Sequence, residues 1–479
     1  MNRQNFPKHL LLALTIITLA AMVGQIRRWQ HDWHPRPRRQ AVLTSYPPSV
    51  TVNTPRASEV LVRFRQGTTV ERIRNITLSK HDLVEDRIES VNGLVAIEDK
   101  DGLDVDAVVN EYRALDEVEY VEPNYSISLD PEPQGAMPPS YLDSASAGPN
   151  DPMFGDQWSL ENTGQRGGVP KADISALAAW EKTKGSEKVV VAVLDSGVDY
   201  THPDLINNMW VRPPNMARYT DDELGTIDDA HGFNAVDDTG DPMDDNGHGT
   251  HCAGIIGAEG DNDKGIAGVN WKVEIMPLKF IGWNGSGTTA DAIKAINYVI
   301  ERKRAGVNVR VINASWGSTA NSKALEDVIR KAGEEGILFV AAAGNSSADS
   351  DRTPHYPAGY NLPNVIAVAA LNRKDELASF SNYGAKSVHI AAPGAEILST
   401  WLNASFEEHS GTSMATPEVS GIAALVLSVD TDLSVKELRQ RLMDATDPLP
   451  GLKGKVVTGG RINAAKAVGA KSSLFTITD

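Results

Sequence analysis

The sequence predicts two folded parts, a small α+β sandwich followed by a large three-layer α/β domain. From about residue 151 onward, short apolar runs rich in β-branched residues alternate with stretches of helical length. Because strands buried on both faces are apolar throughout, this alternation predicts a mostly parallel sheet with helices on both faces. Between residues 57 and 129 the order of expected elements is instead β-α-β-β-α-β, which is typical of a ferredoxin-like sandwich.

The elements of the small part follow from short local patterns. Asn92-Gly93 stands between two β-rich runs and is typical of a two-residue hairpin turn. Apolar residues at helical spacing indicate the two helices. The expected elements are a strand at 60–64, a helix at 69–78, strands at 87–91 and 94–97, a helix at 105–115 and a strand at 118–125.

The large part is expected to alternate continuous apolar strands with helices. The expected strands are 189–194, 273–280, 309–313, 337–342 and 365–369, and the expected helices include 289–303, 322–335 and 413–429. In a parallel sheet of this kind the functional site lies beyond the carboxyl ends of the strands. Asp195 and Asn313 end two of these runs and Asn345 follows a third, so the sequence predicts one cleft that gathers them.

Composition argues against several classes of partner. The 479 residues carry a net charge of −17, which does not suit binding to nucleic acid or to anionic membrane surfaces. The single cysteine, Cys252, excludes an intrachain disulfide, so an exported form would depend on packing or on bound metal. Cys252 follows His248 by four residues, and we expect a small buried side chain there rather than a reactive thiol.

The first residues have the character of an export signal. Arg3 and Lys8 precede an apolar run over 10–23, which is short for a membrane span and typical of a signal peptide. Arg27 and Arg28 follow closely, so an uncleaved membrane anchor is the alternative interpretation. The expected divisions are a signal peptide or anchor at 1–26, a linker at 27–56, the small domain at 57–129, a linker open to proteolysis at 130–150, the large domain at 151–470 and a tail at 471–479.

Three glycine-flanked motifs supply Asp195, His248 and Ser413, in that chain order. A hydroxyl is a weak nucleophile at neutral pH, and it needs a base to take its proton and a carboxylate to orient that base. Taken singly, each residue is more often a turn, loop or cap residue. Together they predict nucleophilic catalysis by Ser413. The motifs occupy residues 193–198, 246–251 and 411–417.

These motifs resemble those of the subtilisin-like serine peptidases, the subtilases, over roughly residues 150–470, and the domain looks thermitase-like. The resemblance implies a subtilisin-like fold and peptide-bond hydrolysis through an acyl-enzyme. It assigns Ser413 as nucleophile, His248 as general base and acid, and Asp195 as the group that orients His248. Asn345, which follows Ala342-Ala343-Gly344, matches the asparagine that stabilises the oxyanion in the family. One departure is Glu418, which follows Pro417 where many relatives carry histidine.

The resemblance also implies the surfaces that bind substrate. An extended peptide is expected to add a strand between two segments of the cleft, with glycines that allow close backbone approach. We expect apolar or medium-sized residues in the first specificity pocket. The two clamping segments are Gly285, Ser286 and Gly287, and Ser315, Trp316 and Gly317, and the pocket is expected to include Ala343, Gly344 and Pro357.

Structural calcium is the expected cofactor. The loop 259–266 is acidic and contains glycine, as oxygen-rich cation loops do, although such a loop by itself is more often a solvated surface. Resemblance to thermitase-like subtilases implies one site from the side chains of Asp151, Asp204 and Asn262 and the carbonyls of Glu259, Lys264 and Ile266. A second site over 237–245 would use Asp237 and Asp241, with Met243 standing where an oxygen ligand is expected.

The small domain resembles a subtilase propeptide, including its closing Tyr120-Val121-Glu122-Pro123-Asn124 stretch. We therefore expect a secreted serine endopeptidase made as a zymogen and a monomer, whose own propeptide assists folding and blocks the cleft. Processing would fall within 130–150. The alternatives are a membrane-tethered processing peptidase of narrow specificity and a non-catalytic binding module of the same fold.

Overall fold

The computed structural model describes residues 55–131 and 148–469. The expected signal peptide or anchor at 1–26, nearly all of the linker at 27–56, most of the processing segment at 130–150 and the tail at 471–479 lie outside the described residues.

The small domain has the expected β-α-β-β-α-β order. Its four strands form an antiparallel sheet in the order β4-β1-β3-β2, and the two helices bury Ile73 and Tyr112 against it. Thr69 begins one helix by accepting the N–H of Arg72, as a threonine N-cap does. The elements are β1 (Pro55–Phe64), α2 (Val70–Ser79), β2 (Leu83–Arg87), β3 (Leu94–Glu98), α3 (Val105–Arg113) and β4 (Val118–Ser128).

The expected strand at 87–91 and its two-residue turn are wrong, although β2 and β3 do pair antiparallel through a longer turn. Strand β2 ends at Arg87, and the residues before Asn92 form a turn in which the N–H of Val91 donates to the carbonyl of Ile88. Ile88 and Val91 are buried in the core that lies beneath the helices of the large domain. Their apolar character therefore reflects docking against another part of the chain, and Ile88 also donates its N–H to the carbonyl of Leu94 at 3.0 Å.

The large domain is built on a nine-stranded sheet that is mostly parallel, as expected. Its order is β17-β18-β14-β13-β12-β11-β5-β9-β8, and the pairing of β17 with β18 is antiparallel. The strands are β5 (Gly185–Asp195), β8 (Phe233–Asn234), β9 (Lys272–Lys279), β11 (Val309–Ala314), β12 (Leu338–Ala342), β13 (Val365–Leu371), β14 (Ile390–Pro393), β17 (Thr446–Pro448) and β18 (Gly460–Ile462).

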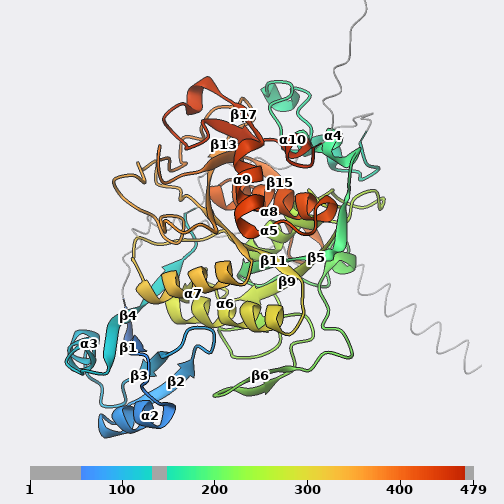
Figure 1. Cartoon of the computed structure of the whole chain (residues 1–479). Coiled ribbons are helices and arrows are strands. Elements are labelled where there is room, and N and C mark those ends of the chain that lie inside the picture. The colour runs from blue at the N-terminus through green and yellow to red at the C-terminus, as the bar shows by residue number, and fades with distance from the viewer. Residues whose placement is uncertain (1–54, 132–147, 470–479) are drawn as a thin grey trace, which may run out of the picture. The chain divides into compact units, whose positions relative to one another are not determined.

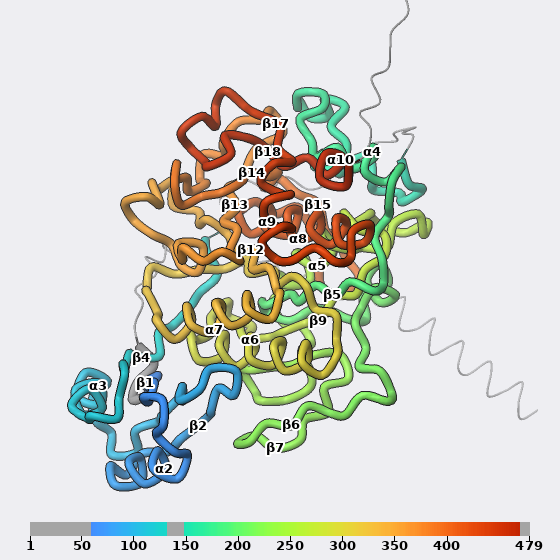
Figure 2. Tube along the Cα trace, in the orientation of Figure 1, coloured from blue at the N-terminus to red at the C-terminus, as the bar shows by residue number. Residues whose placement is uncertain are grey.

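Helices cover both faces of this sheet and form the outer layers. In β5, Val191 and Val193 pack with α5 and α8, whereas Ala192 and Leu194 pack with α6 and α7. This alternation follows from the two-residue period of a strand. Figures 1 and 2 show α6 and α7 side by side. The helices are α4 (Ala176–Trp180), α5 (His248–Gly257), α6 (Thr289–Arg304), α7 (Lys323–Glu334), α8 (Thr412–Val429), α9 (Val435–Asp444) and α10 (Ala464–Ala467).

Five short strands of the large domain lie outside the nine-stranded sheet. They are the hairpin β6 (Tyr219–Asp221) and β7 (Gly225–Ile227), the hairpin β15 (Ile397–Trp401) and β16 (Ser405–His409), and β10 (Ser286–Thr288), which extends the sheet of the small domain.

Helix α8 is long and apolar enough to cross a membrane, alone among the helices of the described residues. Its apolar window is 89% buried inside the protein, so it is a core helix. Two of its neighbours in space are α5 and β5, which bring two further motifs to its first turn.

Candidate active site

Asp195 and His248 meet at the carboxyl end of β5. Asp195 is the last residue of the strand and is fully buried. Its Oδ1 accepts the N–H of Ser196 at 2.8 Å and lies 2.7 Å from Nδ1 of His248. A carboxylate at this distance holds the proton on Nδ1, which leaves Nε2 of the imidazole as a proton acceptor.

Two glycines allow His248 to reach this position at the start of α5. Gly247 has a φ of 109°, and a Cβ atom there would lie 2.4 Å from the ring of Trp401. A Cβ on Gly249 would lie 2.0 Å from the carbonyl oxygen of Gly197. Larger residues at either position would push the helix away from Asp195, which explains the glycines of this motif.

Asp244 holds the two motifs together, a role that sequence reasoning missed because it lies in the acidic run considered for calcium. Its carboxylate accepts the hydroxyl of Ser196 at 2.9 Å, the N–H of Gly247 at 3.0 Å and the hydroxyl of Thr250 at 2.6 Å. Ser196 in turn accepts the N–H of Gly249 at 2.9 Å. The end of β5 and the start of α5 are therefore tied by one buried carboxylate.

Ser413 lies in the first turn of α8. Its hydroxyl donates to the carbonyl of Ser315 at 2.9 Å, and its own carbonyl accepts the hydroxyl of Ser315 at 2.8 Å. Cys252 is buried beneath, as expected, with its Sγ 3.5 Å from the carbonyl of Ser413 and within 4.8 Å of ligand atoms of Asp195 and His248. The structure thus brings the three motif residues and Cys252 into one buried group.

Asn345 follows the end of β12 by three residues and contacts Thr412, the residue before Ser413. Its Oδ1 accepts both the N–H and the hydroxyl of Thr412, each at 2.9 Å. These two bonds fix the orientation of the amide. A Cβ on Gly411 would lie 3.2 Å from its Nδ2, which places the donor beside the backbone that leads into Ser413.

The predicted clamping segments hold the end of the small domain between them. Strand β10 pairs antiparallel with β4, with Gly287 opposite Ile127, and the N–H of Leu129 donates to the carbonyl of Gly285 at 2.9 Å. Ser128 also bridges Gly317 on the other side. The chain of the small domain therefore occupies this part of the cleft as the middle of three strands.

The family of the chain is decided by comparison with known proteins. The model of the subtilase family matches residues 186–469, which is more than half of the chain. The chain belongs to the subtilase family. It is 35% identical to a thermophilic serine proteinase of a Bacillus species (strain AK1) over 86% of this chain and 90% of that protein, and 35% identical to thermitase of Thermoactinomyces vulgaris over 67% of this chain and 99% of thermitase.

The family and its relatives show that this subtilase is a serine endopeptidase. The crystal structure of fervidolysin from Fervidobacterium pennivorans, described as a keratinolytic enzyme related to subtilisin, aligns with a TM-score of 0.66 at 24% identity. That alignment covers 87% of this chain and 61% of the fervidolysin chain, and it shows the shared fold.

The remaining predicted substrate residues of the subtilase contribute mainly backbone. The ring of Trp316 is buried against Phe280 and its Nε1 donates to the carbonyl of Leu194 at 2.9 Å, so the side chain faces the core. A Cβ on Gly317 would lie 2.1 Å from Nε2 of His355, which explains the glycine. The predicted pocket residues Ala343, Gly344 and Pro357 are all buried.

The loop predicted to hold calcium brings its carboxylates together. Oδ2 of Asp151 accepts the N–H of Asp261 at 2.7 Å, and the carboxylate of Asp204 accepts the N–H of Ile266 at 3.0 Å and the amide of Asn262 at 2.8 Å. Burial raises the pKa of both Asp151 and Asp204 to about 6. Oδ1 of Asp151 is buried and finds no hydrogen-bond partner among the described residues.

The other two residues predicted to contribute carbonyls, Glu259 and Lys264, belong to the same loop. The N–H of Glu259 donates to the carbonyl of Asp204 at 2.8 Å, and Nζ of Lys264 donates to the carbonyl of Pro203 at 3.2 Å. The predicted donor set of oxygens, two of them on buried carboxylates, fits a hard cation such as calcium.

The second predicted calcium run is organised by Asn234. Its Nδ2 donates to Oδ2 of Asp237 at 3.0 Å and to the carbonyl of Asp241 at 3.1 Å. Oδ1 of Asp241 accepts the hydroxyl of Tyr200 at 3.0 Å and the N–H of Met243 at 3.2 Å. One oxygen of each carboxylate thus has a protein donor, as the carboxylates of the first predicted site also do.

Proposed function

We propose that this subtilase hydrolyses peptide bonds through Asp195, His248 and Ser413, with Asn345 in the oxyanion hole, and that it is made as a zymogen. The assignment rests on the distance of 2.7 Å between Nδ1 of His248 and Oδ1 of Asp195, together with the position of Ser413 at the start of α8.

Each step of the reaction has a named group. The Oγ of Ser413 attacks the scissile carbonyl carbon while Nε2 of His248 takes its proton. The tetrahedral oxygen accepts hydrogen bonds from Nδ2 of Asn345 and from the N–H of Ser413 at the positive end of α8. His248 then protonates the departing amine, which leaves an ester on Ser413. Water, deprotonated by His248, hydrolyses that ester. Asp195 stays ionised and stabilises the imidazolium.

The resting hydroxyl must turn before it reacts. Ser413 donates at 2.9 Å to the carbonyl of Ser315, which belongs to a clamping segment. A rotation about its Cα–Cβ bond redirects the hydroxyl toward His248. Ser413 is only 4% exposed, so this rotation is a change from one staggered rotamer to another within a packed site.

The zymogen proposal is supported by contacts between the small domain and the helices α6 and α7. Glu122 accepts the N–H groups of Lys323 and Ala324 at 2.8 and 3.1 Å, where a negative charge is favoured at the start of α7. Asn124 accepts the N–H of Ala290 at 2.8 Å at the start of α6. With β4 in the cleft, these contacts hold the domain where it excludes substrate.

Substrate is proposed to bind as residues 126–129 do, as an extended strand between the clamping segments. Main-chain hydrogen bonds then supply affinity for many sequences, and the pocket near Ala343, Gly344 and Pro357 selects among apolar or medium-sized residues. Calcium at Asp151 and Asp204 would fix the start of the large domain to the loop 259–266. We further propose secretion, with retention on the outer face of a membrane by the N-terminal segment as the alternative.

One experiment tests the assignment. The full-length chain and its Ser413→Ala variant are incubated with casein and then subjected to N-terminal sequencing. The wild-type chain is expected to hydrolyse casein and to acquire a new N-terminus within 130–150, while Ser413→Ala stays full length and inactive. Casein hydrolysis by Ser413→Ala would refute the role of Ser413, and an inactive, uncut wild-type chain would favour a binding module.

A further inference from the structure

An acidic cluster joins the small domain to the hairpin β6–β7 of the large domain, outside the active site and both predicted calcium loops. Asp86 lies in β2, and Asp221 and Glu223 lie at the tip of the hairpin. Carboxylate oxygens of these three residues lie within 4.8 Å of one another. Like charges this close repel strongly unless protons or cations separate them.

Asp86 is the residue that most needs a partner. It is only 4% exposed, and its buried Oδ1 has no hydrogen-bond partner among the described residues. Burial, together with the charge of Asp221, raises its pKa well above the usual range. A carboxylate taken out of water without donors is costly, so this group either carries a proton or faces a cation.

The other two carboxylates are held in place by their own hairpin. Oδ1 of Asp221 accepts the N–H groups of Glu223 and Leu224, both at 2.8 Å, and its Oδ2 lies 3.3 Å from the hydroxyl of Tyr219. Oε2 of Glu223 is buried without a hydrogen-bond partner among the described residues. The hairpin therefore presents fixed oxygens toward Asp86.

The basic side chains nearby are engaged elsewhere or stand at a distance. Arg87 pairs with Asp222, and its Nε is 4.0 Å from Glu223. Arg74 is 3.6 Å from Glu223, so both arginines form ion pairs with Glu223 at the long end of the usual range, and within the described residues neither guanidinium pairs with Asp86. Nζ of Lys294 contacts Asp238 at 2.7 Å and Asp291 at 3.8 Å, and it acts on Asp86 only through space.

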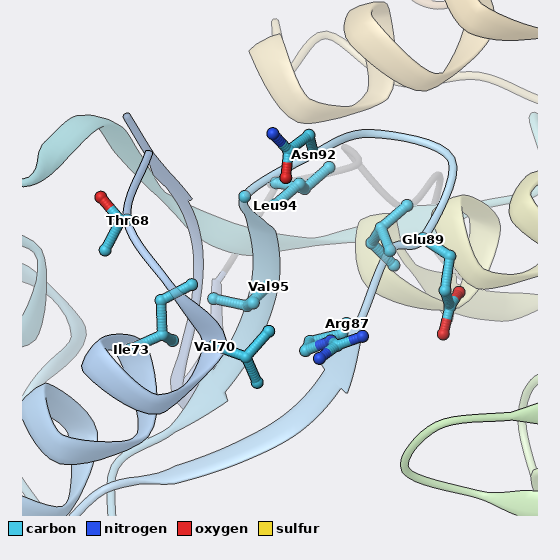
Figure 3. Close-up of a pocket in the computed structure, with 10 residues that line it drawn as sticks. Thr68, Val70, Ile73, Arg87, Glu89, Asn92, Leu94 and Val95 are labelled. Carbon is cyan, nitrogen blue, oxygen red and sulfur yellow. The ribbon is translucent and has the colours of Figure 1, made fainter. Parts of the chain in front are cut away.

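The spacing and chemistry of the cluster fit calcium. Calcium binds oxygen at about 2.3–2.6 Å, so ligand oxygens across the ion lie about 5 Å apart. The three residues supply only carboxylate oxygen, which suits a hard cation and not a soft transition metal. Arg87, the next residue after Asp86, and Glu89 line a separate cavity of about 180 Å³, shown in Figure 3, which the three carboxylates themselves do not line.

We propose that a calcium ion binds between Asp86, Asp221 and Glu223 and clamps the small domain to the hairpin of the large domain. Because the ligands come from both domains, the complete site exists only while they are docked. By mass action, calcium then stabilises the docked form, and its withdrawal loosens the inhibitory domain. This inference rests on the proposal that the small domain remains docked until processing.

The test uses full-length chain carrying Ser413→Ala, whose intact length is verified by mass spectrometry, so that the result is distinguishable from a failure of the catalytic proposal. Bound calcium is counted and its affinity measured by titration calorimetry. Asp86→Asn is expected to lose one equivalent, or to weaken it by at least roughly tenfold, as expected when a group that holds a metal is removed. Glu85→Gln, an exposed neighbour on the same strand, is the matched control and should bind as the parent does.

A second variant and a second readout keep the proposal refutable. Glu223→Gln should lose the same equivalent as Asp86→Asn, whereas Asp204→Asn should lose a different one. Calcium should slow amide hydrogen exchange over 83–98 in the parent and in Glu85→Gln but not in Asp86→Asn. Equal calcium counts and affinities in Asp86→Asn and Glu85→Gln, or equal slowing of exchange by calcium, would overturn the proposal.

Discussion

Glu418 gives the sharpest test of the energetics of this subtilase. It lies in α8, five residues beyond Ser413, and is 1% exposed. Burial raises its pKa to about 8, and a hydrogen bond with Ser159 offsets only part of this. Its Oε2 finds no hydrogen-bond partner among the described residues. The native protein therefore keeps this carboxyl protonated at pH values where an unfolded chain has released the proton.

The sign of the effect follows from proton linkage. A raised native pKa means that stability is fully present below the unfolded pKa of about 4.5 and is lost as the pH rises through about 8. Each tenfold change in proton affinity corresponds to about 1.4 kcal/mol, so the complete loss is roughly 5 kcal/mol. Between pH 5 and pH 8 the loss is about 3–4 kcal/mol.

The variant Glu418→Gln keeps the size of the side chain and a neutral hydrogen-bonding group but cannot ionise. Thermal unfolding is measured in the Ser413→Ala background with saturating calcium. The difference in melting temperature between Glu418→Gln and the parent should increase by about 5 °C between pH 5 and pH 8, whatever its value at pH 5. This figure uses about 1.5 °C per kcal/mol for a domain of this size. The exposed Glu181→Gln is the control and should show no such trend. A difference for Glu418→Gln that stays constant or shrinks with pH would refute the reasoning.

Three further predictions concern the cleft, the calcium loop and the docked domain. Asn345→Ala should lower kcat about 100- to 1000-fold on a peptide substrate, the range known for loss of such a donor in subtilisin, and an effect confined to KM would contradict the assignment. EDTA should lower the melting temperature of the parent more than that of Asp204→Asn, and equal effects in the two proteins would contradict the calcium site. Calcium affinity should also fall below about pH 6, where protons compete for Asp151 and Asp204. Glu122→Gln should shorten the lag before caseinolytic activity appears, because it weakens a charge-assisted cap on α7; an unchanged lag would count against that contact.

Some elements were predictable because their signals are local. The run before Asp195 is apolar at every position, so its burial on both faces and its place in a parallel sheet follow from composition alone. The expected helices at 289–303, 322–335 and 413–429 differ from α6, α7 and α8 by at most one residue at either end. The helix-start signals are local too, such as Ser322, which accepts the N–H of Leu325.

Other elements were not predictable because their signals depend on residues far away in the chain. The run before Asn92 has the composition of a strand, yet Ile88 and Val91 are apolar because they pack beneath α6. Asp244 lies in an acidic run typical of a cation loop, yet its donors are Ser196, Gly247 and Thr250. Nothing in the sequence around Asp86 indicates that it faces a hairpin more than a hundred residues away.

The sequence by itself predicted the reacting groups that we propose, since Asp195, His248 and Ser413 each lie in a glycine-flanked motif. It also determined the alternation of strands and helices, which follows from the period of apolar residues. Only the tertiary structure decided which groups meet: Asn345 beside Gly411, β4 between the clamping segments, and Asp86 opposite Asp221. The physical reason is that periodicity and turn chemistry act over a few residues, whereas contacts between distant residues are set by the packing of the whole core.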